Sequence, residues 1–124
     1  MHPTTTAPAT VFEYLDYLEF LRYQYYDRKR KSAAFSYRYM AGKLAMDPGS
    51  LGGIFKGRRK LNPALAASLG KVFGLGEGGI EYFQTLVLYG QAESPVEKNI
   101  FLEKLLRLRS NQGDRYVLDA VPFP

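Results

Sequence analysis

The stretch SYRYMAGKLAMDPGSLGGIFKGRRKLNPALAASLGKVF, residues 36–73, decides the fold. Ser36 is a candidate N-cap, and the pairs Asp47-Pro48 and Asn62-Pro63 each place a capping side chain directly before a proline at the first helical position. Gly57 and Gly74 follow the second and third apolar runs, where glycine commonly ends a helix. The stretch therefore predicts three short helices with tight connections, the first ending at Leu44 or Ala45, the second near Lys56 and the third at Gly74.

Four apolar residues within this stretch stand at a fixed spacing. Ala41 is small where the first two helices approach each other, and Ala45 follows at the turn, where glycine is usual because the backbone is tight or left-handed. Leu51 and Ile54 face inward from the second helix. This spacing resembles the helix-turn-helix of the Cro/lambda-repressor type. The resemblance implies a DNA-binding core at roughly residues 35–73.

Helical periodicity continues on both sides of this core. Residues 12–31 repeat apolar positions at spacings of three and four, with acids first and bases last, which suits the helix dipole. We expect this helix to pack across the core through Leu18, Leu21 and Tyr25. Two further helices are expected, over residues 77–89 and 95–109. The fold class is therefore all-α, a Cro/lambda-repressor-like domain of five or six helices with extra C-terminal helices.

The two ends of the chain lack this pattern. Residues 1–10 are polar and aperiodic, and we expect them to be flexible. Residues 111–124 finish with two prolines, which predicts an extended C-terminal tail. Residues 11–110 are then the helical domain.

A second resemblance covers most of the chain. The segments VFEYLDYLEFLRYQYYDRKRK (11–31), FSYRYMAGKLAMDPGSLGGIFKGRRKLNP (35–63) and EYFQTLVLYGQAESPVEKNIFLEKLLRLR (81–109) resemble the N-terminal region of a poorly characterised bacterial paralogous family, expanded in Fibrobacter-type genomes. Its members usually continue into a second helical domain and are presumed transcriptional regulators, which is the role that the resemblance implies here. This chain has RYVLDAVPFP (115–124) where that domain would begin, so we expect a truncated or naturally short form and assign it no effector-sensing role.

Positive charge is concentrated in one part of the sequence. Residues 28–60 hold ten basic residues and one acidic residue, a net charge of +9, whereas the rest of the chain holds seven basic and eleven acidic residues, a net charge of −4. Such polarity predicts a polyanionic partner. Combined with the helix-turn-helix spacing, it indicates double-stranded DNA.

The candidate DNA-contacting residues come from the core and its basic loop. In this type of fold the second helix enters the major groove, but its outward positions here are mainly glycines, so we expect weak base readout. Hydroxyl and basic side chains supply phosphate contacts instead, with residues 28–31 as a flank. The full set is Ser36, Tyr37, Arg38, Lys43, Gly49, Ser50, Gly53, Lys56, Arg58, Arg59 and Lys60.

Composition argues against most other function classes. The chain has no cysteine, and its only histidine is His2, beside the N-terminus, so no metal site, cofactor or histidine-based catalytic triad is expected. No glycine-rich phosphate loop follows a strand, and we expect no enzyme activity. No apolar run is long enough to span a bilayer and residues 1–10 do not resemble a signal peptide, so we expect a cytoplasmic, nucleoid-associated protein without a membrane partner.

Two further expectations concern protein partners. Leucines at positions 102, 105, 106 and 108 surround much of the last helix, and we expect a homodimer through the C-terminal helices. The alternative function is a protein-interaction module or adaptor that uses the helix-turn-helix only as a scaffold. The bare second helix favours this alternative, and the concentrated positive charge opposes it.

Overall fold

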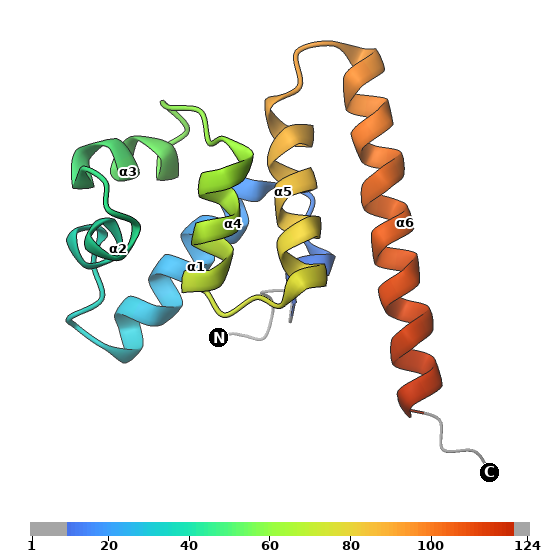
Figure 1. Ribbon diagram of the computed structural model, residues 1–124, viewed down its shortest axis with the longest axis horizontal. Helices are drawn as coiled ribbons and strands as arrows, with labels where there is room; N and C mark the ends of the chain where they lie inside the picture. The colour runs from blue at the N-terminus through green and yellow to red at the C-terminus, as the bar shows by residue number, and fades with distance from the viewer. Residues whose placement is uncertain (1–9, 121–124) are drawn as a thin grey trace, which may run out of the picture.

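A computed structural model describes the backbone of residues 10–120 and the side chains of residues 10–112. All regular structure in this part of the chain is helical, which confirms the all-α class (Figure 1). The elements are a short 3-10 helix η2 (Val11–Glu13) and six α-helices, α1 (Tyr17–Lys31), α2 (Tyr37–Leu44), α3 (Pro48–Phe55), α4 (Pro63–Val72), α5 (Glu77–Gln91) and α6 (Pro95–Ala120).

The three predicted helix starts are confirmed. The side chain of Ser36 accepts a hydrogen bond from the backbone N–H of Tyr39 at 3.1 Å. Asp47 and Asn62 accept in the same way, from residues three positions on, at 2.9 and 2.8 Å. Each such cap contributes about 1 kcal/mol. These caps define where α2, α3 and α4 begin.

The connection between α2 and α3 is tight. Ala45 ends α2 in the left-handed conformation (φ 55°, ψ 48°), as the sequence spacing predicts for this position. The next N–H, of Met46, donates to the carbonyl of Ala41 at 3.0 Å. Leu51 and Ile54 are 0% and 2% exposed, which confirms that they face inward from α3. The two helices are therefore fixed to each other by a short turn and a shared apolar contact.

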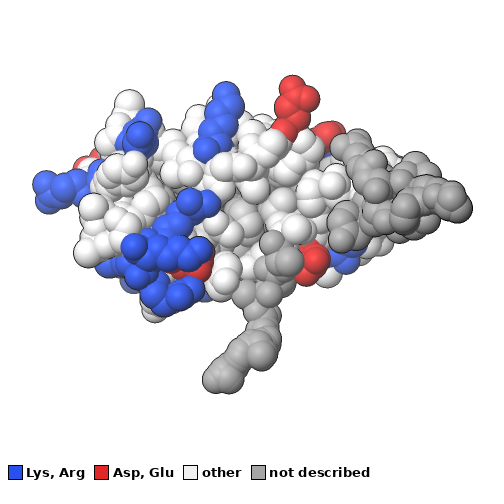
Figure 2. Space-filling view, turned by 90° about the horizontal axis from the view of Figure 1, so that it is seen from below, with Lys and Arg blue, Asp and Glu red and all other residues white. Residues whose placement is uncertain are grey.

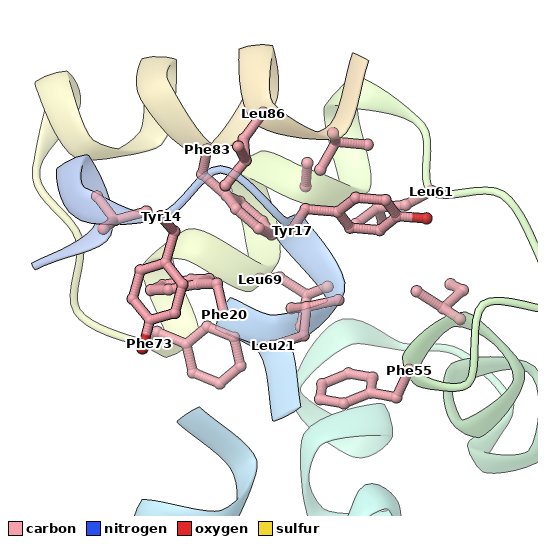
Figure 3. Packing of buried hydrophobic residues seen from close by; sticks show 14 of the residues in the cluster. Tyr14, Tyr17, Phe20, Leu21, Phe55, Leu61, Leu69, Phe73, Phe83 and Leu86 are labelled. Atoms are coloured by element: carbon pink, nitrogen blue, oxygen red, sulfur yellow. The ribbon is translucent and has the colours of Figure 1, made fainter. Parts of the chain in front are cut away.

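A continuous apolar core joins α1 to the helices on either side. Figure 3 shows the rings of Tyr14, Phe20 and Phe73 grouped beneath α5, with Leu69 and Leu21 beside them. The ring centroid of Phe20 lies 5.2 Å from that of Tyr14 and 6.0 Å from that of Phe73, and both contacts are edge-to-face. Leu21 is buried, and Leu18 and Tyr25 pack at its margin, so the predicted packing of this helix through these three residues is confirmed.

The predicted first helix, residues 12–31, is wrong at its N-terminal end. The chain forms η2, becomes extended at Tyr14 (φ −92°, ψ 146°), and begins α1 only at Tyr17. Asp16 caps the new start by accepting from the N–H of Leu18 at 2.9 Å. The extended backbone lets the Tyr14 ring enter the core, and the Tyr82 hydroxyl donates to the Tyr14 carbonyl at 2.6 Å. This tertiary contact replaces the helical hydrogen bonds that the periodicity predicts.

The predicted extended tail is wrong as far as residue 120. The last helix was expected over residues 95–109, but α6 continues to Ala120. Proline disfavours a helix only at its own position, at the residue before it and at the carbonyl four residues earlier, so the prolines at 122 and 124 do not prevent a helix through residues 111–117. Residues 121–124, and the expected flexibility of residues 1–9, lie outside the described residues.

The C-terminal half is a helical hairpin that closes one side of the core. Helices α5 and α6 lie side by side, and α6 also contacts η2 (Figure 1). Arg109 joins these parts, because its Nε donates to the Phe12 carbonyl at 2.7 Å and its Nη2 to the Tyr82 hydroxyl at 3.2 Å. The hairpin is therefore attached to the N-terminal segment and lies away from α2 and α3.

Candidate nucleic-acid interface

The residues on the outward face of α3 have small side chains. Leu51, Ile54 and Phe55 point into the core, and Gly49 and Lys56 are exposed. Gly53 is partly exposed between them. Ser50 is half-buried, and its N–H is occupied by the Asp47 cap. A helix with this surface lets its backbone approach a flat or concave partner closely.

The loop after α3 folds back over the end of the helix. Gly57 reverses the chain with a positive φ of 79°, a conformation that glycine adopts without strain. The N–H groups of Arg58 and Arg59 then donate to the carbonyl of Gly53 at 2.8 and 3.3 Å. The basic loop, residues 57–60, is therefore held against α3.

The far end of the basic loop is fixed by α5. The Gln91 side chain accepts from the Leu61 N–H at 2.8 Å and donates to the Leu61 carbonyl at 3.1 Å, so it pairs with the backbone as a strand would. Lys60 forms an exposed ion pair with Glu93 at 3.1 Å. Arg22 of α1 donates from Nε to the Phe55 carbonyl at 3.1 Å and secures the end of α3. The loop is therefore held by α3 at one end and by α5 at the other, and α1 fixes the end of α3 that precedes it.

Five cations of α2, the end of α3 and the basic loop are exposed and make no ion pair within the described part of the chain: Arg38, Lys43, Lys56, Arg58 and Arg59. Lys43 lies on the flank of α2 that faces α4, which leaves the other four for this surface. Lys56, Arg58 and Arg59 follow one another at the end of α3, and Arg38 is in the first turn of α2. Because these charges have no internal partner, they are available to an anionic ligand.

The start of α2 contributes two more of the candidate residues. Ser36 uses its oxygen as a cap acceptor. Tyr37 packs its ring on Tyr25, with centroids 4.5 Å apart and nearly parallel, and on Phe55 at 5.2 Å. Burial raises the pKa of the Tyr37 phenol, so this group stays protonated at neutral pH. Tyr37 therefore mainly fixes α2 against α1 and α3.

The remaining basic residues lie elsewhere. Lys43 lines a groove of about 630 Å³ with Arg28 of α1 and Lys71 of α4, on the flank of α2 that faces α4. Arg28 donates to the Phe73 carbonyl at 2.7 Å and caps the end of α4. Arg30 and Lys31 pair with Asp27 at 2.6 and 3.1 Å. The structure therefore separates Lys43 and the flank at residues 28–31 from the outward face of α3.

Charge is unevenly distributed over the molecular surface. In Figure 2 most of the visible Lys and Arg side chains gather at the end of the molecule that holds α2, α3 and the C-terminal end of α1, with a small area of acidic surface among them, and other acidic side chains lie toward the hairpin. This pattern agrees with the charge distribution along the sequence. The α2–α3 end is the positive pole of this face.

Sequence reasoning missed two residues that organise this surface. Gln91 and Arg22 occupy ordinary positions in helical patterns, and each acts on a backbone group about thirty residues away in the sequence. No local signal in the sequence marks such long-range hydrogen bonds. Their role is visible only once the helices are assembled.

No group of three or more potential metal-ligating side chains comes together in the described residues. None of the helices in residues 10–120 combines the length and hydropathy that crossing a bilayer requires. In comparisons with known proteins, no family model, curated protein or solved structure matches the chain.

Proposed function

We propose that the protein binds double-stranded DNA through α2, α3 and the basic loop, in the manner of a Cro/lambda-repressor-type helix-turn-helix, and acts as a transcriptional regulator. The observation that carries this proposal is the set of four cations without an ion pair in the described residues, Arg38, Lys56, Arg58 and Arg59, around an α3 whose own outward side chains are small. The left-handed Ala45 between two short capped helices supports the same geometry.

Phosphate contacts supply most of the binding free energy in this proposal. Arginine and lysine displace condensed counterions when they neutralise phosphates, and each contact contributes about −0.9 to the slope of log K against log salt concentration. Three phosphate contacts from one protomer, by Arg38, Lys56 and Arg58, then predict a slope of about −2.7. Lys60, which pairs with Glu93, and Lys43, on the α4 flank, are assigned smaller roles.

The experiment is a fluorescence anisotropy titration of a labelled mixed-sequence duplex at several salt concentrations. The double variant Lys56→Ala/Arg58→Ala should weaken binding to every duplex and reduce the slope by about 2. A matched control is Lys104→Ala/Arg107→Ala, which removes the same charge from α6, where Lys104 pairs with Glu81 at 3.6 Å.

The control decides whether location or net charge is responsible. If both double variants lose affinity equally, the protein attracts DNA only through its overall charge and the assigned surface is wrong. If the unsubstituted protein binds no duplex at low salt, the proposed function is wrong.

The hairpin exposes apolar side chains of α6, and we propose that these side chains bind a second copy of the chain. Val96, Ile100 and Leu106 of α6 are 69%, 58% and 47% exposed, while Leu105 is fully buried and Leu108 packs on the core. A two-fold dimer places paired reading helices about one DNA turn apart, ~34 Å. Sedimentation of the Ile100→Glu variant as a monomer, with the unsubstituted chain as a dimer, is the expected result.

The second candidate function is a protein-interaction module, and the same exposed apolar residues of α6 are the observation that favours it. Under that function these residues bind a different protein and the chain sediments as a monomer. DNA binding would then be weak and equally sensitive to both double variants.

A further inference from the structure

At Gly53 the outward face of α3 is partly covered by a side chain from the basic loop, whereas Gly49 in the first turn stays exposed. A Cβ atom placed on Gly53 would lie 3.0 Å from both Cγ and Cδ of Arg59, and 3.8 Å from its Cβ. The 3.0 Å distances are shorter than nearly all contacts that a real Cβ atom makes, so the Arg59 side chain would have to move by a few tenths of an ångström to admit one. The aliphatic stem of Arg59 therefore occupies the place of a residue-53 side chain.

Gly53 holds Arg59 through its backbone as well. Its carbonyl accepts the N–H of Arg59 at 3.3 Å and that of Arg58 at 2.8 Å. The neighbouring glycine differs, because a Cβ on Gly52 would meet only the Tyr37 ring, at an ordinary contact distance of 3.7 Å. The two adjacent glycines thus have different surroundings, and Gly53 is the site against which the Arg59 side chain packs. We call this site the seat of Arg59.

We propose that Arg59, seated on Gly53, is the base-reading side chain of this surface and selects guanine in the major groove. This inference rests on the proposed function and names the base that the site prefers. Arginine donates two parallel hydrogen bonds to the O6 and N7 atoms of guanine, a geometry that lysine cannot reproduce. The Arg59 guanidinium makes no ion pair in the described chain, so its donors are available.

The seat explains how a glycine-rich helix reads sequence. A long exposed side chain normally loses rotamer entropy on binding, which lowers affinity. Packing of the Cγ and Cδ atoms against α3 restricts these rotamers before DNA arrives. Arg58 is assigned to phosphate contact. The first turn of α3, where Gly49 is exposed, allows close approach, and the loop supplies the reading group.

The test is selection of duplexes from a randomised library by the full chain, followed by affinity measurements on the selected site and on versions that replace each guanine. Arg59→Lys keeps the charge and loses the paired donors. Discrimination of the read guanine should fall by roughly 5- to 150-fold, the equivalent of the usual 1–3 kcal/mol for such a pair, while the salt slope stays unchanged.

Gly53→Gln places a side chain where the Arg59 stem packs and leaves Arg59 itself unchanged, so this variant should lose the same discrimination of guanine. Its matched control is Gly42→Gln in α2, where an added Cβ meets nothing within 4 Å. Both variants replace a helical glycine with a better helix former, but the control should retain guanine discrimination. Because the readout is a ratio of affinities, a uniform loss of binding does not affect it.

The outcomes separate this inference from the proposed function. If the chain binds duplexes without base preference, or if Arg59→Lys keeps the preference, Arg59 is not the reading residue and the inference is overturned while DNA binding stands. If the unsubstituted chain binds no duplex, the proposed function falls, and the inference falls with it.

Discussion

Gln91 should be the polar side chain whose removal most strongly weakens the basic loop. Its amide makes both hydrogen bonds to the Leu61 backbone, at 2.8 and 3.1 Å, and accepts from the Tyr17 hydroxyl at 3.3 Å. Leu61 is 1% exposed, so Gln91→Ala leaves its N–H and carbonyl without a partner. At about 1 kcal/mol for each hydrogen bond, the free energy of unfolding should fall by about 2–3 kcal/mol.

This loss of unfolding free energy corresponds to a measurable decrease in the melting temperature. With an unfolding entropy of roughly 2.1 cal/mol/K per residue, a chain of 124 residues should melt ~8–12 °C lower. Thermal and urea unfolding followed by circular dichroism give the two values independently. DNA affinity should fall in the folded variant, because the loop that carries Arg58 and Arg59 is no longer held at Leu61.

A matched control lies on the same helix. Gln84 donates a single exposed hydrogen bond, at 2.9 Å, to the Pro63 carbonyl, so Gln84→Ala should cost less than about 1 kcal/mol. Gln91→Glu keeps the acceptor and loses the donor, and should fall between the two alanine variants. If Gln91→Ala and Gln84→Ala melt at the same temperature, the reasoning about Leu61 is refuted.

Three other predictions concern local features. Tyr14 is buried, and its hydroxyl has no hydrogen-bond partner among the described residues; burial raises the pKa of its phenol to about 12. The unfolded phenol ionises near pH 10, so stability should be complete below pH 10 and fall by roughly 2–3 kcal/mol as pH rises to 12, and Tyr14→Phe should flatten this loss in urea titrations. Ala45→Gly should raise the free energy of unfolding by about 0.5–1 kcal/mol, because glycine adopts the left-handed φ of 55° without a Cβ clash; Ala45→Val should lower it. Asp47→Ala should cost about 1 kcal/mol through loss of the α3 cap, a change that amide exchange at Ser50 would detect.

Local signals predicted most of the helices. Ser36, Asp47 and Asn62 cap helices where the sequence places them, because capping depends on a few adjacent residues. The start of α1 escaped prediction because burial of Tyr14, and the hydrogen bond from Tyr82 to its carbonyl, act across 68 residues. The two prolines at the end of the chain led us to expect an extended tail from residue 111, whereas α6 continues to Ala120.

The candidate site was predictable in composition and less so in arrangement. Basic residues after α3 were evident, but the sequence does not show which of them are paired internally. Arg28 caps α4 and Lys60 pairs with Glu93, so neither is as available as its charge suggests. The two adjacent glycines of α3 differ only in what lies above them, Tyr37 for one and Arg59 for the other. Such contacts require the assembled fold.

The most direct test of DNA binding through α2, α3 and the basic loop is a backbone-amide NMR titration of the full chain with a short duplex. The largest shift changes should fall on residues 36–38 and 48–60, with the exposed face of α6 changed only if dimerisation is coupled to binding. Shift changes confined to α5 and α6, or none at all at low salt, would contradict the account.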